Sequence, residues 1–519
     1  MNLIEVLRQQ AEVFPQAPAI IEKKRTVTFG ELLELSGKAA AFLSKEGIKA
    51  GDPILVLQPM SIELYVALLA IFRLGAIAMF LDPSAGRKHI EQCCEISPPR
   101  ALIALGKAHL LRLISPALRK IPLKFSIGAS VPGALNWKKI EKMAVFDPSI
   151  RQSSPEEAAL LTFTSGSTGM PKAAVRSHGF LLTQHGVLVQ SLELKPGEVD
   201  LTTLPIFVLA NLASGVTSLL PDTDLRHPGK IDPVPVLDQI KIFSPSRTVA
   251  SPALLERLAD YCLDKGEKIP SFLFIFSGGA PVFPSLLDKL QKVAPSASVF
   301  AAYGSTEAEP IAHIARSEIS PNDFALMLDG NGLLVGPPIP SIRLAVVPDR
   351  WGERMGPFNN VEFEKSFLDP GEFGEIVVAG DHVMKGYLNG EGDEETKFKV
   401  DDDVWHRTGD AGALDTLGRV WLFGRCSARI EDERGKVYPF AVECALDREP
   451  GIQRAAFLSV GKKRVLAVEK KESCGEISFD SLEWAHIDRV VLCKKIPVDK
   501  RHNAKIDYPA LYRIVEELV

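Results

Sequence analysis

The sequence predicts an α/β protein with a large, mostly parallel first part, a β-rich stretch after about residue 326, and a small α+β C-terminal part. In about the first 300 residues, short apolar runs alternate with helical patterns, as in parallel strands joined by crossover helices. Beyond residue 326 the apolar runs shorten and are separated by glycine and proline, which is typical of antiparallel strands and turns. A chain of 519 residues also exceeds the size of one hydrophobic core, so several domains are expected.

The elements of the first part follow from these patterns. Strands are predicted at 53–58, 101–105, 272–277 and 298–303, and helices at 32–47 and 284–294. The longest apolar run, residues 62–81, contains Arg73 near its centre, which a membrane span would resist. We therefore predict a buried helix that ends near Gly75, followed by a strand through Met79 to Leu81.

The later elements are read in the same way. Short strands are predicted within 330–348, 374–380 and 418–425, then a helix at 439–450, a hairpin at 455–471 and a closing helix at 506–518. Residues 423–437 are rich in charged and small side chains. This composition suits either a connection between domains or a simple surface loop.

Composition narrows the function classes. The net charge of −5 gives no electrostatic reason to expect nucleic acid or an anionic membrane as partner. Seven cysteines without a CxxC pair argue against a disulfide framework or a zinc site and favour a reducing compartment. The N-terminus has no long apolar core of a secretory signal, so we expect a cytoplasmic protein without stable membrane insertion.

Residues 162–179, TFTSGSTGMPKAAVRSHG, combine six hydroxyl side chains, three glycines and one lysine. Such a segment is typical of a phosphate-binding loop, although glycine and serine also mark ordinary surface turns. Pro171 precedes Lys172, and the residues after the lysine have a strand pattern, so this is not a Walker P-loop. We predict a loop between two strands, with its hydroxyls on phosphate oxygens and Lys172 supplying positive charge.

Four further segments carry chemically suggestive residues: SGGAP at 277–281, AAYGSTEAEP at 301–310, HRTGDAG at 406–412 and HNAKI at 502–506. Each residue also has an ordinary interpretation when it is taken singly: Glu307 as a solvated carboxylate at a strand end, Asp410 as a turn residue and Lys505 as a surface lysine. Only the ordered set of segments favours a functional interpretation.

That ordered set, together with residues 28–57, resembles the adenylate-forming superfamily of acyl-CoA synthetases, peptide-synthetase adenylation domains and firefly luciferase. The resemblance extends over nearly the whole chain. It implies an acyl-CoA synthetase-like fold, with an N-terminal AMP-binding domain at 1–424 and a small mobile C-terminal domain at 425–519.

The resemblance also implies roles for individual residues. The loop from Thr164 to Lys172 would hold the β- and γ-phosphates of ATP, residues 279–281 would border the adenine, and Tyr303 would stack on it. Thr306 would touch the α-phosphate, Glu307 would hold Mg²⁺, Asp410 with Arg425 would bind the ribose, and Lys505 would reach the reacting oxygens. The implied nucleotide-binding set is Thr164, Ser165, Gly166, Ser167, Thr168, Gly169, Lys172, Gly279, Ala280, Pro281, Tyr303, Gly304, Ser305, Asp410 and Arg425. The implied catalytic set is Lys505, Glu307 and Thr306, with Glu307 as the metal ligand.

The implied chemistry begins with a poor electrophile, a carboxylate. Its oxygen attacks the α-phosphorus of ATP and expels pyrophosphate, which leaves a reactive acyl-adenylate. Charge builds on the phosphoryl oxygens, so the enzyme needs positioned cations and no nucleophile of its own.

Several positions depart from the common superfamily pattern. Val208 replaces a frequent histidine near the acyl pocket, and Ala173 and Ala504 replace glycines. Ser427 stands at the usual hinge aspartate, and Glu431 at a usual lysine before an acidic turn that is one residue longer. Because that turn borders the thiol cofactor in CoA ligases, these departures count against a standard CoA ligase.

The departures, and segments such as LPIFVLANLASGVTSLLPD (204–222) and PVDKRHNAKI (497–506), resemble the β-lactone synthetase branch of bacterial long-chain olefin biosynthesis. This resemblance implies a long-chain 2-alkyl-3-hydroxy fatty acid as substrate, whose own hydroxyl attacks the activated carbonyl to give a β-lactone and AMP. His178 is either the base for that step or a structural histidine, and residues 208–216 either line an acyl tunnel or form a core helix.

Two other functions stay open at this point: a fatty acyl-CoA synthetase, and a nucleotide-binding regulator that has lost catalysis. Retention of Lys172, Glu307, Asp410 and Lys505 argues against the regulator. The expected partners are a fatty acid and other enzymes of the same pathway, and no nucleic acid.

Overall fold

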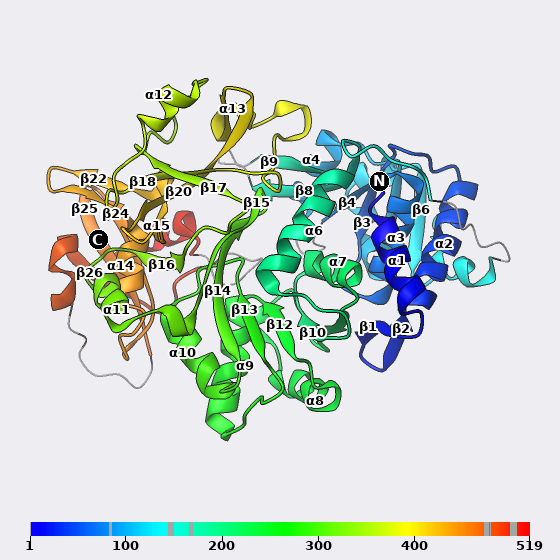
Figure 1. The fold of residues 1–519 in the computed structure, drawn as a ribbon, viewed down its shortest axis with the longest axis horizontal. Helices are drawn as coiled ribbons and strands as arrows, with labels where there is room; N and C mark the ends of the chain where they lie inside the picture. The colour runs from blue at the N-terminus through cyan, green and yellow to red at the C-terminus, as the bar shows by residue number, and fades with distance from the viewer. Residues whose placement is uncertain are drawn as a thin grey trace. The chain divides into compact units, whose positions relative to one another are not determined.

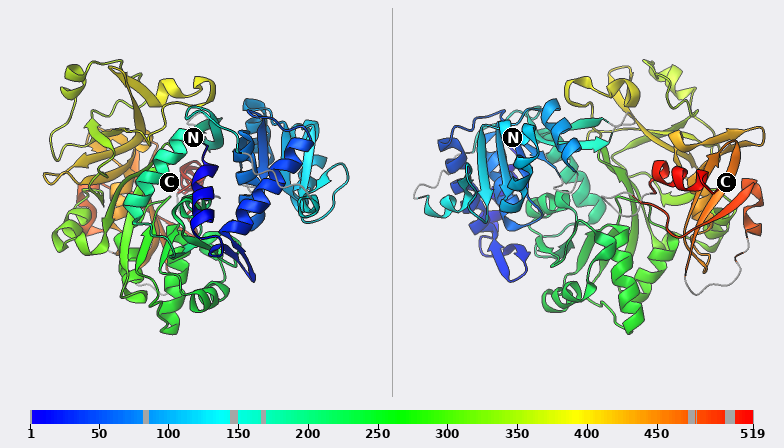
Figure 2. Two further views of the ribbon diagram at one scale, coloured as in Figure 1. Left: turned by 45° about the vertical axis from the view of Figure 1, so that its right-hand side comes forward. Right: turned by 180° about the vertical axis from the view of Figure 1, so that it is seen from behind.

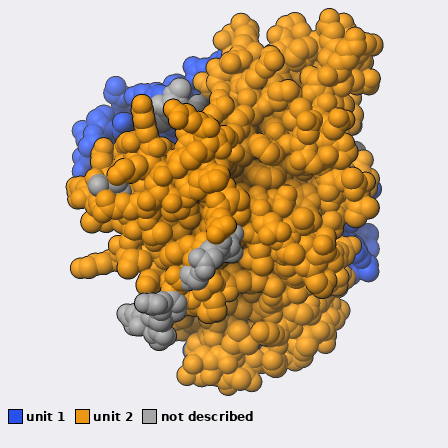
Figure 3. All heavy atoms as spheres, turned by 90° about the vertical axis from the view of Figure 1, so that its left-hand side faces the viewer, with its two compact units in different colours: residues 1–223, 234–248, 386–393 blue, residues 224–233, 249–385, 394–519 orange. Residues whose placement is uncertain are grey.

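The structure is a computed structural model that describes residues 2–81, 86–143, 150–165, 170–471, 477, 479–498 and 506–518. It contains two compact units, coloured separately in Figure 3. Unit 1 comprises Met1–Thr223, Val234–Thr248 and Gly386–Asp393, and unit 2 comprises Asp224–Pro233, Val249–Lys385 and Glu394–Val519. The predicted domain boundary between residues 424 and 425 is a different division of the chain and stays a prediction.

Unit 1 contains a mainly parallel sheet in the order β7-β6-β5-β3-β4-β8-β9. Its last pair, β8 with β9, is antiparallel. The strands are β3 (Pro53–Leu57), β4 (Ile77–Phe80), β5 (Ala101–Leu105), β6 (Leu123–Ile127), β7 (Leu135–Asn136), β8 (Ala158–Ser165) and β9 (Pro171–Ser177). The predicted strands at 53–58 and 101–105 are thereby confirmed.

Two hydrophobic cores belong to this sheet. One contains side chains of α2 (Phe29–Lys45), α3 (Ile62–Leu74) and the 3-10 helix η2 (Trp137–Lys142). The other contains side chains of α4 (Arg87–Ile96) and α5 (Pro116–Lys120), beside the 3-10 helix η1 (Gly106–Leu113). Figures 1 and 2 show these helices around the blue and cyan strands.

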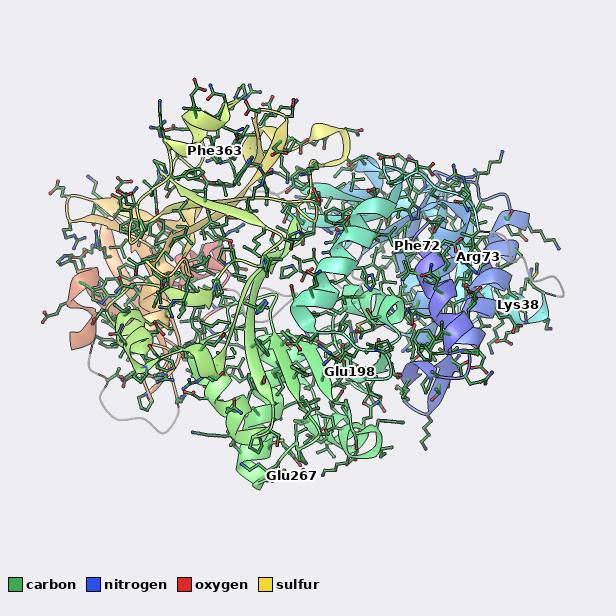
Figure 4. All side chains as sticks on the ribbon, in the orientation of Figure 1. Lys38, Phe72, Arg73, Glu198, Glu267 and Phe363 are labelled. Atoms are coloured by element: carbon green, nitrogen blue, oxygen red, sulfur yellow. The ribbon has the colours of Figure 1, made fainter. Side chains whose placement is uncertain are left out.

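Helix α3 is the predicted buried helix. Ser61 caps its start by accepting a hydrogen bond from Leu64 N, and Gly75 ends it in the left-handed conformation (φ 67°) that glycine tolerates. Arg73, labelled in Figure 4 beside Phe72, is 2% exposed, and its Nη2 lies 3.4 Å from Leu33 O. No helix among the described residues is long and apolar enough to cross a membrane.

Unit 1 also holds a second group of strands. β1 (Pro18–Glu22) runs parallel to β11 (Thr217–Leu220) and antiparallel to β2 (Arg25–Thr28), and β10 (Val199–Thr202) runs parallel to β11. The helices of this region are α1 (Ile4–Val13), α6 (His178–Leu192), α7 (Pro205–Ser214) and α8 (Pro233–Phe243). Helix α7 packs against α1 and α6.

Unit 2 begins with strands that carry predicted site residues at their ends. β13 (Phe274–Ser277) is parallel to β14 (Ser298–Ser305), which is antiparallel to β15 (Ala308–Ala315). Helices α9 (Pro252–Lys265) and α10 (Pro284–Val293) pack against each other, and α10 packs on β14. The predicted strands at 272–277 and 298–303 and the helix at 284–294 are confirmed. β12 (Arg247–Ala250) spans the point where the chain passes from unit 1 to unit 2.

The predicted β-rich stretch is an antiparallel sheet in the order β16-β21-β20-β18-β17, with β19 paired to β20. Its strands are β16 (Leu333–Gly336), β17 (Arg343–Val347), β18 (Gly374–Ala379), β19 (Lys397–Val400), β20 (Asp403–Leu414) and β21 (Val420–Arg425). Helix α11 (Pro321–Leu328) precedes β16 in the chain, and the short helices α12 (Asn360–Glu364) and α13 (Asp393–Thr396) lie between later strands of the sheet. Phe363, labelled in Figure 4, is buried in a core with side chains of β17, β18 and β19.

The C-terminal part of unit 2 has two hydrophobic cores whose described members lie between Ile430 and Val515. Strands β24 (Ile452–Val460) and β25 (Lys463–Lys470) form the predicted hairpin, and β26 (Arg489–Cys493) runs parallel to β25. A small hairpin of β22 (Ile430–Asp432) and β23 (Gly435–Val437) precedes α14 (Pro439–Ala445), and α15 (Tyr508–Glu516) closes the chain.

Helix α14 is shorter than the predicted helix at 439–450, because it ends at Ala445. Pro450 disfavours helical backbone just before it. Asp447, two residues after the end of the helix, accepts hydrogen bonds from Ser285 N (2.9 Å) and Ser285 Oγ (2.6 Å) at the start of α10. This contact with α10, distant in sequence, therefore holds Asp447 at a position where a longer α14 would have continued.

Candidate active site

In unit 1, the predicted phosphate loop lies between two antiparallel strands, as expected. Thr164 on β8 is paired directly with Lys172 on β9, and Ser165 is paired with Pro171. Four residues of the predicted loop, Gly166, Ser167, Thr168 and Gly169, lie outside the described residues. The strand pairing places the lysine opposite the beginning of the loop.

The side chain of Lys172 extends along the segment 386–393 of the same unit. Its Nζ lies 5.7 Å from the centroid of the Tyr387 ring, and a Cβ on Gly392 would lie 2.8 Å from that Nζ. A side chain at position 392 would therefore collide with the side chain of Lys172, and glycine avoids this. Ala173, the residue that departs from the superfamily glycine, is 2% exposed and belongs to the second core of the sheet.

In unit 2, the glycine-rich segment directly follows β13. Gly278 allows close approach to β14, since a Cβ there would lie 3.2 Å from Ala302 O. Gly279 has a φ of 81°, which an L-residue rarely adopts, and open space surrounds the position of its missing Cβ. Ala280 and Pro281 follow, before α10 begins. The backbone at Gly279 is uncrowded on the side of its missing Cβ, and the predicted role of residues 279–281 beside the adenine stays a prediction.

Three predicted nucleotide-binding residues meet at one carboxylate in unit 2. The hydroxyl of Tyr303 donates to Oδ2 of Asp410 at 2.8 Å, and Nη1 of Arg425 donates to Oδ1 at 2.8 Å. Asp410 and Arg425 are direct partners in the β20–β21 ladder. Nη1 of Arg425 also donates to Thr408 O at 3.1 Å. Both carboxylate oxygens are therefore oriented by the protein.

The electrostatics of this cluster agree with its hydrogen bonds. Burial, and then the negative charge of Asp410, raise the pKa of Tyr303 well above its ordinary value. The charge of Asp410 raises the pKa of Arg425. Near neutral pH the phenol is a donor and the guanidinium is charged, so Asp410 faces two donors on the protein side.

The other predicted residues of β14 form the turn into β15. The Ser305 hydroxyl accepts hydrogen bonds from the backbone N–H groups of Glu307 and Ala308, each at 3.2 Å. Gly304 is required by crowding, since a Cβ there would lie 3.0 Å from Ala308 O. Thr306 and Glu307 are thus carried on a tight turn that is closed by the Ser305 side chain.

The surroundings of Glu307 are polar but contain a neutral histidine. The Glu307 carbonyl accepts a hydrogen bond from Met384 N at 2.8 Å. Burial lowers the pKa of His406 to about 3, so this ring carries no charge beside the carboxylate. Among the described residues, no group of three or more His, Cys, Asp or Glu side chains could hold a metal ion. A Mg²⁺ ion held by one carboxylate and phosphate oxygens fits this donor set, because it needs no dedicated cage.

A buried ion pair that the sequence analysis missed supports Asp410. Arg407 donates to Glu375 through Nε (3.0 Å) and Nη2 (2.6 Å), and the two side chains are 1% and 0% exposed. Nη1 of Arg407 also donates to Glu353 O at 2.6 Å. The pair joins β20 to β18 three residues before Asp410. Glu375, the single charged residue of the otherwise apolar strand β18, was the available signal.

The structure describes the residues on both sides of the segment with the predicted catalytic lysine, but not the segment itself. Lys505 lies outside the described residues, as do the others from 499 to 505. The residues on either side, Val498 and Ile506, form an antiparallel β-bridge with each other. The predicted role of Lys505 stays a prediction.

The charged segment 423–437 contains the end of β21, a 3-10 helix at Cys426–Ala428 and the hairpin of β22 and β23. Arg464, fully buried, donates to Asp432 through Nε (2.9 Å) and Nη2 (2.7 Å) and to Gly435 O at 2.7 Å. Arg434 donates to both Asp432 and Asp488. The turn between β22 and β23 is therefore bound to the C-terminal sheet by two arginines.

His178 is a structural histidine. It is fully buried, its Nδ1 accepts a hydrogen bond from Leu3 N at 3.2 Å, and burial lowers its pKa to about 4. Helix α7 fits the core-helix interpretation of residues 208–216, because Val208 and Leu212 are 0% and 1% exposed within the first core of the sheet.

Comparisons with known proteins agree with these features. The family described as AMP-binding enzyme matches residues 7–388. The chain is 31% identical to the olefin β-lactone synthetases of Xanthomonas campestris pv. campestris and Stenotrophomonas maltophilia, over 93% of this chain and 89% and 90% of theirs. It is 24% identical to 4-coumarate-CoA ligase 1 of Narcissus pseudonarcissus, over 90% of this chain and 82% of that one.

Solved structures show the same fold at lower identity. The amide bond synthetase McbA from Marinactinospora thermotolerans superposes with a TM-score of 0.81 at 20% identity, over 99% of both chains. The anthranilate CoA ligase AuaEII, in complex with anthranoyl-AMP, superposes with a TM-score of 0.83 at 18% identity, over 100% of this chain and 98% of that one. The predicted α/β fold of adenylate-forming enzymes is confirmed.

Proposed function

Since the chain belongs to the AMP-binding enzyme family and is an ATP-dependent, adenylate-forming ligase, we propose that it converts a long-chain 2-alkyl-3-hydroxy acid into a β-lactone. The observation that carries this proposal is the similarity, over nearly the whole chain, to two olefin β-lactone synthetases. That identity exceeds the identity to the CoA ligase named above.

In the proposed first step, the substrate carboxylate attacks the α-phosphorus of ATP, and pyrophosphate leaves. Lys172 and the loop that begins at Thr164 bind the β- and γ-phosphates. Asp410 holds the ribose, with its orientation set by Tyr303 and Arg425. Glu307 would hold Mg²⁺, which neutralises phosphate charge when bound. Lys505 stabilises the charge that develops on the reacting oxygens.

In the proposed second step, the 3-hydroxyl oxygen of the substrate attacks the acyl carbonyl. A carbon–oxygen bond closes the four-membered ring, the bond between the carbonyl carbon and the phosphate oxygen breaks, and AMP leaves while the hydroxyl proton is released. Holding hydroxyl and carbonyl in one molecule replaces a bimolecular encounter, which favours ring closure despite its strain. His178 is excluded as the base by its burial and its bond to Leu3.

The hairpin of β22 and β23 supports a second step without CoA. In CoA ligases, the corresponding turn is glycine-rich and borders the thiol cofactor. Here its aspartate is bound by Arg434 and Arg464, and Glu431, which stands at the usual lysine, has a 58% exposed side chain. Glu431 in place of the usual lysine removes one positive charge that would attract an anionic cofactor.

A fatty acyl-CoA synthetase is the second candidate, because the relatives include a CoA ligase that shares most of the chain. Both candidates begin with acyl-AMP. The division into domains at 1–424 and 425–519, a mobile C-terminal domain, a cytoplasmic location, and association with enzymes of the same pathway belong to the proposal in either case.

Product analysis separates the candidates. The enzyme is incubated with MgATP and a racemic 2-alkyl-3-hydroxy fatty acid, or with the matched acid that lacks the hydroxyl, each with and without CoA. We expect a β-lactone from the hydroxy acid without CoA and none from the matched acid. A thioester that forms only with CoA would contradict the proposal in favour of the synthetase, and no AMP from any acid would favour a regulator.

A further inference from the structure

Three large apolar side chains of unit 1 lie exposed close together in the chain. Leu110, Leu113 and Ile114 are 65%, 74% and 54% exposed, in the second half of η1 and just beyond it. Their neighbours Ala108 and Leu111 pack against the core beneath α4 and α5. The segment therefore buries one set of apolar side chains and presents another to the solvent.

The segment that exposes these three side chains is held in place by hydrogen bonds to the rest of unit 1. His109 is 3% exposed, and its Nε2 lies 3.1 Å from Phe125 O on β6. Nη1 of Arg112 donates to Pro132 O at 3.2 Å, and Nη2 of Arg119 donates to Leu113 O at 3.0 Å. These bonds hold η1 and α5 in place, with the three apolar side chains outside.

The sequence around these side chains carries charges of one sign. From Ile96 to Ile140 the sequence contains no Asp or Glu, although the whole chain has 65 among 519 residues, about one in eight. The same stretch contains eight Lys and Arg: Arg100, Lys107, Arg112, Arg119, Lys120, Lys124, Lys138 and Lys139. A local cluster of positive charge attracts an anionic partner even when the net charge of the whole chain is negative.

Four of these cations share η1 and α5 with the apolar side chains. We call the set Lys107, Leu110, Arg112, Leu113, Ile114, Arg119 and Lys120 the η1–α5 face. No ion pair among the described residues involves its lysines or arginines. The adjacent helix α4 contributes Glu91 and Glu95, and Glu91 is already paired with Arg87.

We propose that the η1–α5 face docks on an anionic phospholipid bilayer. Leucine and isoleucine side chains enter the boundary between headgroups and acyl chains, while the surrounding lysines and arginines remain at the level of the phosphates. A nucleic acid or an acidic protein would match the cations but would leave three adjacent large apolar side chains unexplained. The contact is peripheral, and it does not depend on the proposed reaction.

The test uses the full-length protein and flotation with vesicles of phosphatidylcholine, with or without phosphatidylglycerol. We expect flotation with the anionic vesicles, weakened by salt, and little with the neutral ones. The triple variant Leu110→Ser/Leu113→Ser/Ile114→Ser and the pair Lys107→Gln/Lys120→Gln should each weaken the binding about tenfold or more. Thermal unfolding and pyrophosphate exchange should stay unchanged, because these residues lie outside the candidate site.

Matched controls use equally exposed side chains elsewhere. Ile242→Ser/Leu417→Ser replaces side chains that are 72% and 74% exposed, and Lys365→Gln/Lys463→Gln removes two exposed lysines. Neither control should alter flotation. The proposal is overturned if the wild type ignores anionic vesicles, or if the controls lose as much binding as the face variants. Binding to poly-glutamate that is insensitive to the triple variant, without vesicle binding, would assign the face to an acidic protein instead.

Discussion

Tyr303 and Asp410 are joined by a hydrogen bond of 2.8 Å from the phenol to Oδ2, across 107 residues of sequence. The bond links the end of β14 to β20, two strands of different sheets in unit 2. It leaves the tyrosine ring in a fixed orientation and, together with Arg425, fixes the carboxylate. A rigid carboxylate beside a rigid ring suits recognition of a ribose and its base.

Removing only the phenol oxygen tests this relationship. In Tyr303→Phe the ring remains but Asp410 loses one donor, and a hydrogen bond to a charged group is worth about 1.5–3 kcal/mol. We expect the KM for ATP in pyrophosphate exchange to rise about tenfold or more, with kcat changed far less. Tyr512→Phe, at a tyrosine that is 38% exposed, is the control. An unchanged KM for ATP would show that the bond does not serve nucleotide binding.

The buried pair of Arg407 and Glu375 should dominate the local stability of the β-rich sheet. Arg407→Met leaves Glu375 buried without its partner, which costs about 3–5 kcal/mol of the free energy of unfolding. Arg343→Met breaks an exposed ion pair with Asp403 and should cost about 1 kcal/mol or less. Urea unfolding of both variants measures the difference. Equal, small losses would mean that the pair does not hold β20 to β18.

Glu443 predicts a pH dependence of stability in the C-terminal part. Burial raises its pKa to about 8 in the folded state, where Tyr508 donates a hydrogen bond to it. The folded protein thus retains a proton that the unfolded chain loses above its ordinary pKa of 4.5. The contribution of Glu443 to the free energy of unfolding is therefore full at low pH and declines as the pH rises toward 8.

Glu443→Gln removes this decline. We expect the stability of the variant relative to wild type to increase between about pH 5 and pH 8 and to level off above that range, in urea titrations at each pH. Glu364→Gln, at an exposed glutamate, should show no such trend. A constant difference across the range would contradict the raised pKa.

Lys505→Ala should abolish adenylation while ATP still binds. The lysine is expected to act on the reacting oxygens, whereas binding of the nucleotide depends on residues of other segments. Pyrophosphate exchange measures the first effect and calorimetric titration with ATP the second, with Lys495→Ala as the control. Loss of ATP binding together with loss of pyrophosphate exchange would contradict the role assigned to Lys505.

Much of the fold could be predicted from the sequence because its signals are local. The capped helix that ends at Gly75 and the strands on both sides of the phosphate loop follow from apolar periodicity and from glycine and proline. Superfamily motifs added the candidate residues, and three of them, Tyr303, Asp410 and Arg425, lie within hydrogen-bond reach in unit 2.

The rest depended on contacts that no local pattern encodes. Arg407 reaches Glu375 only through the register of two strands, and Asp447 ends α14 early by binding Ser285. His178 is buried and accepts a hydrogen bond from Leu3 N, far away in sequence. The η1–α5 face could not be predicted from the net charge, because a net charge summed over the whole chain does not reveal a local cluster of lysines and arginines.

The fate of the carboxylate oxygens tests the central claim most directly. The substrate acid is labelled with ¹⁸O in both carboxylate oxygens, and AMP and lactone from one incubation with MgATP are examined by mass spectrometry. If the carboxylate is joined to the α-phosphorus and the hydroxyl then attacks the carbonyl, AMP gains one ¹⁸O and the lactone keeps one. Unlabelled AMP with a doubly labelled lactone would contradict the account, because the carboxylate would then have displaced an activated hydroxyl.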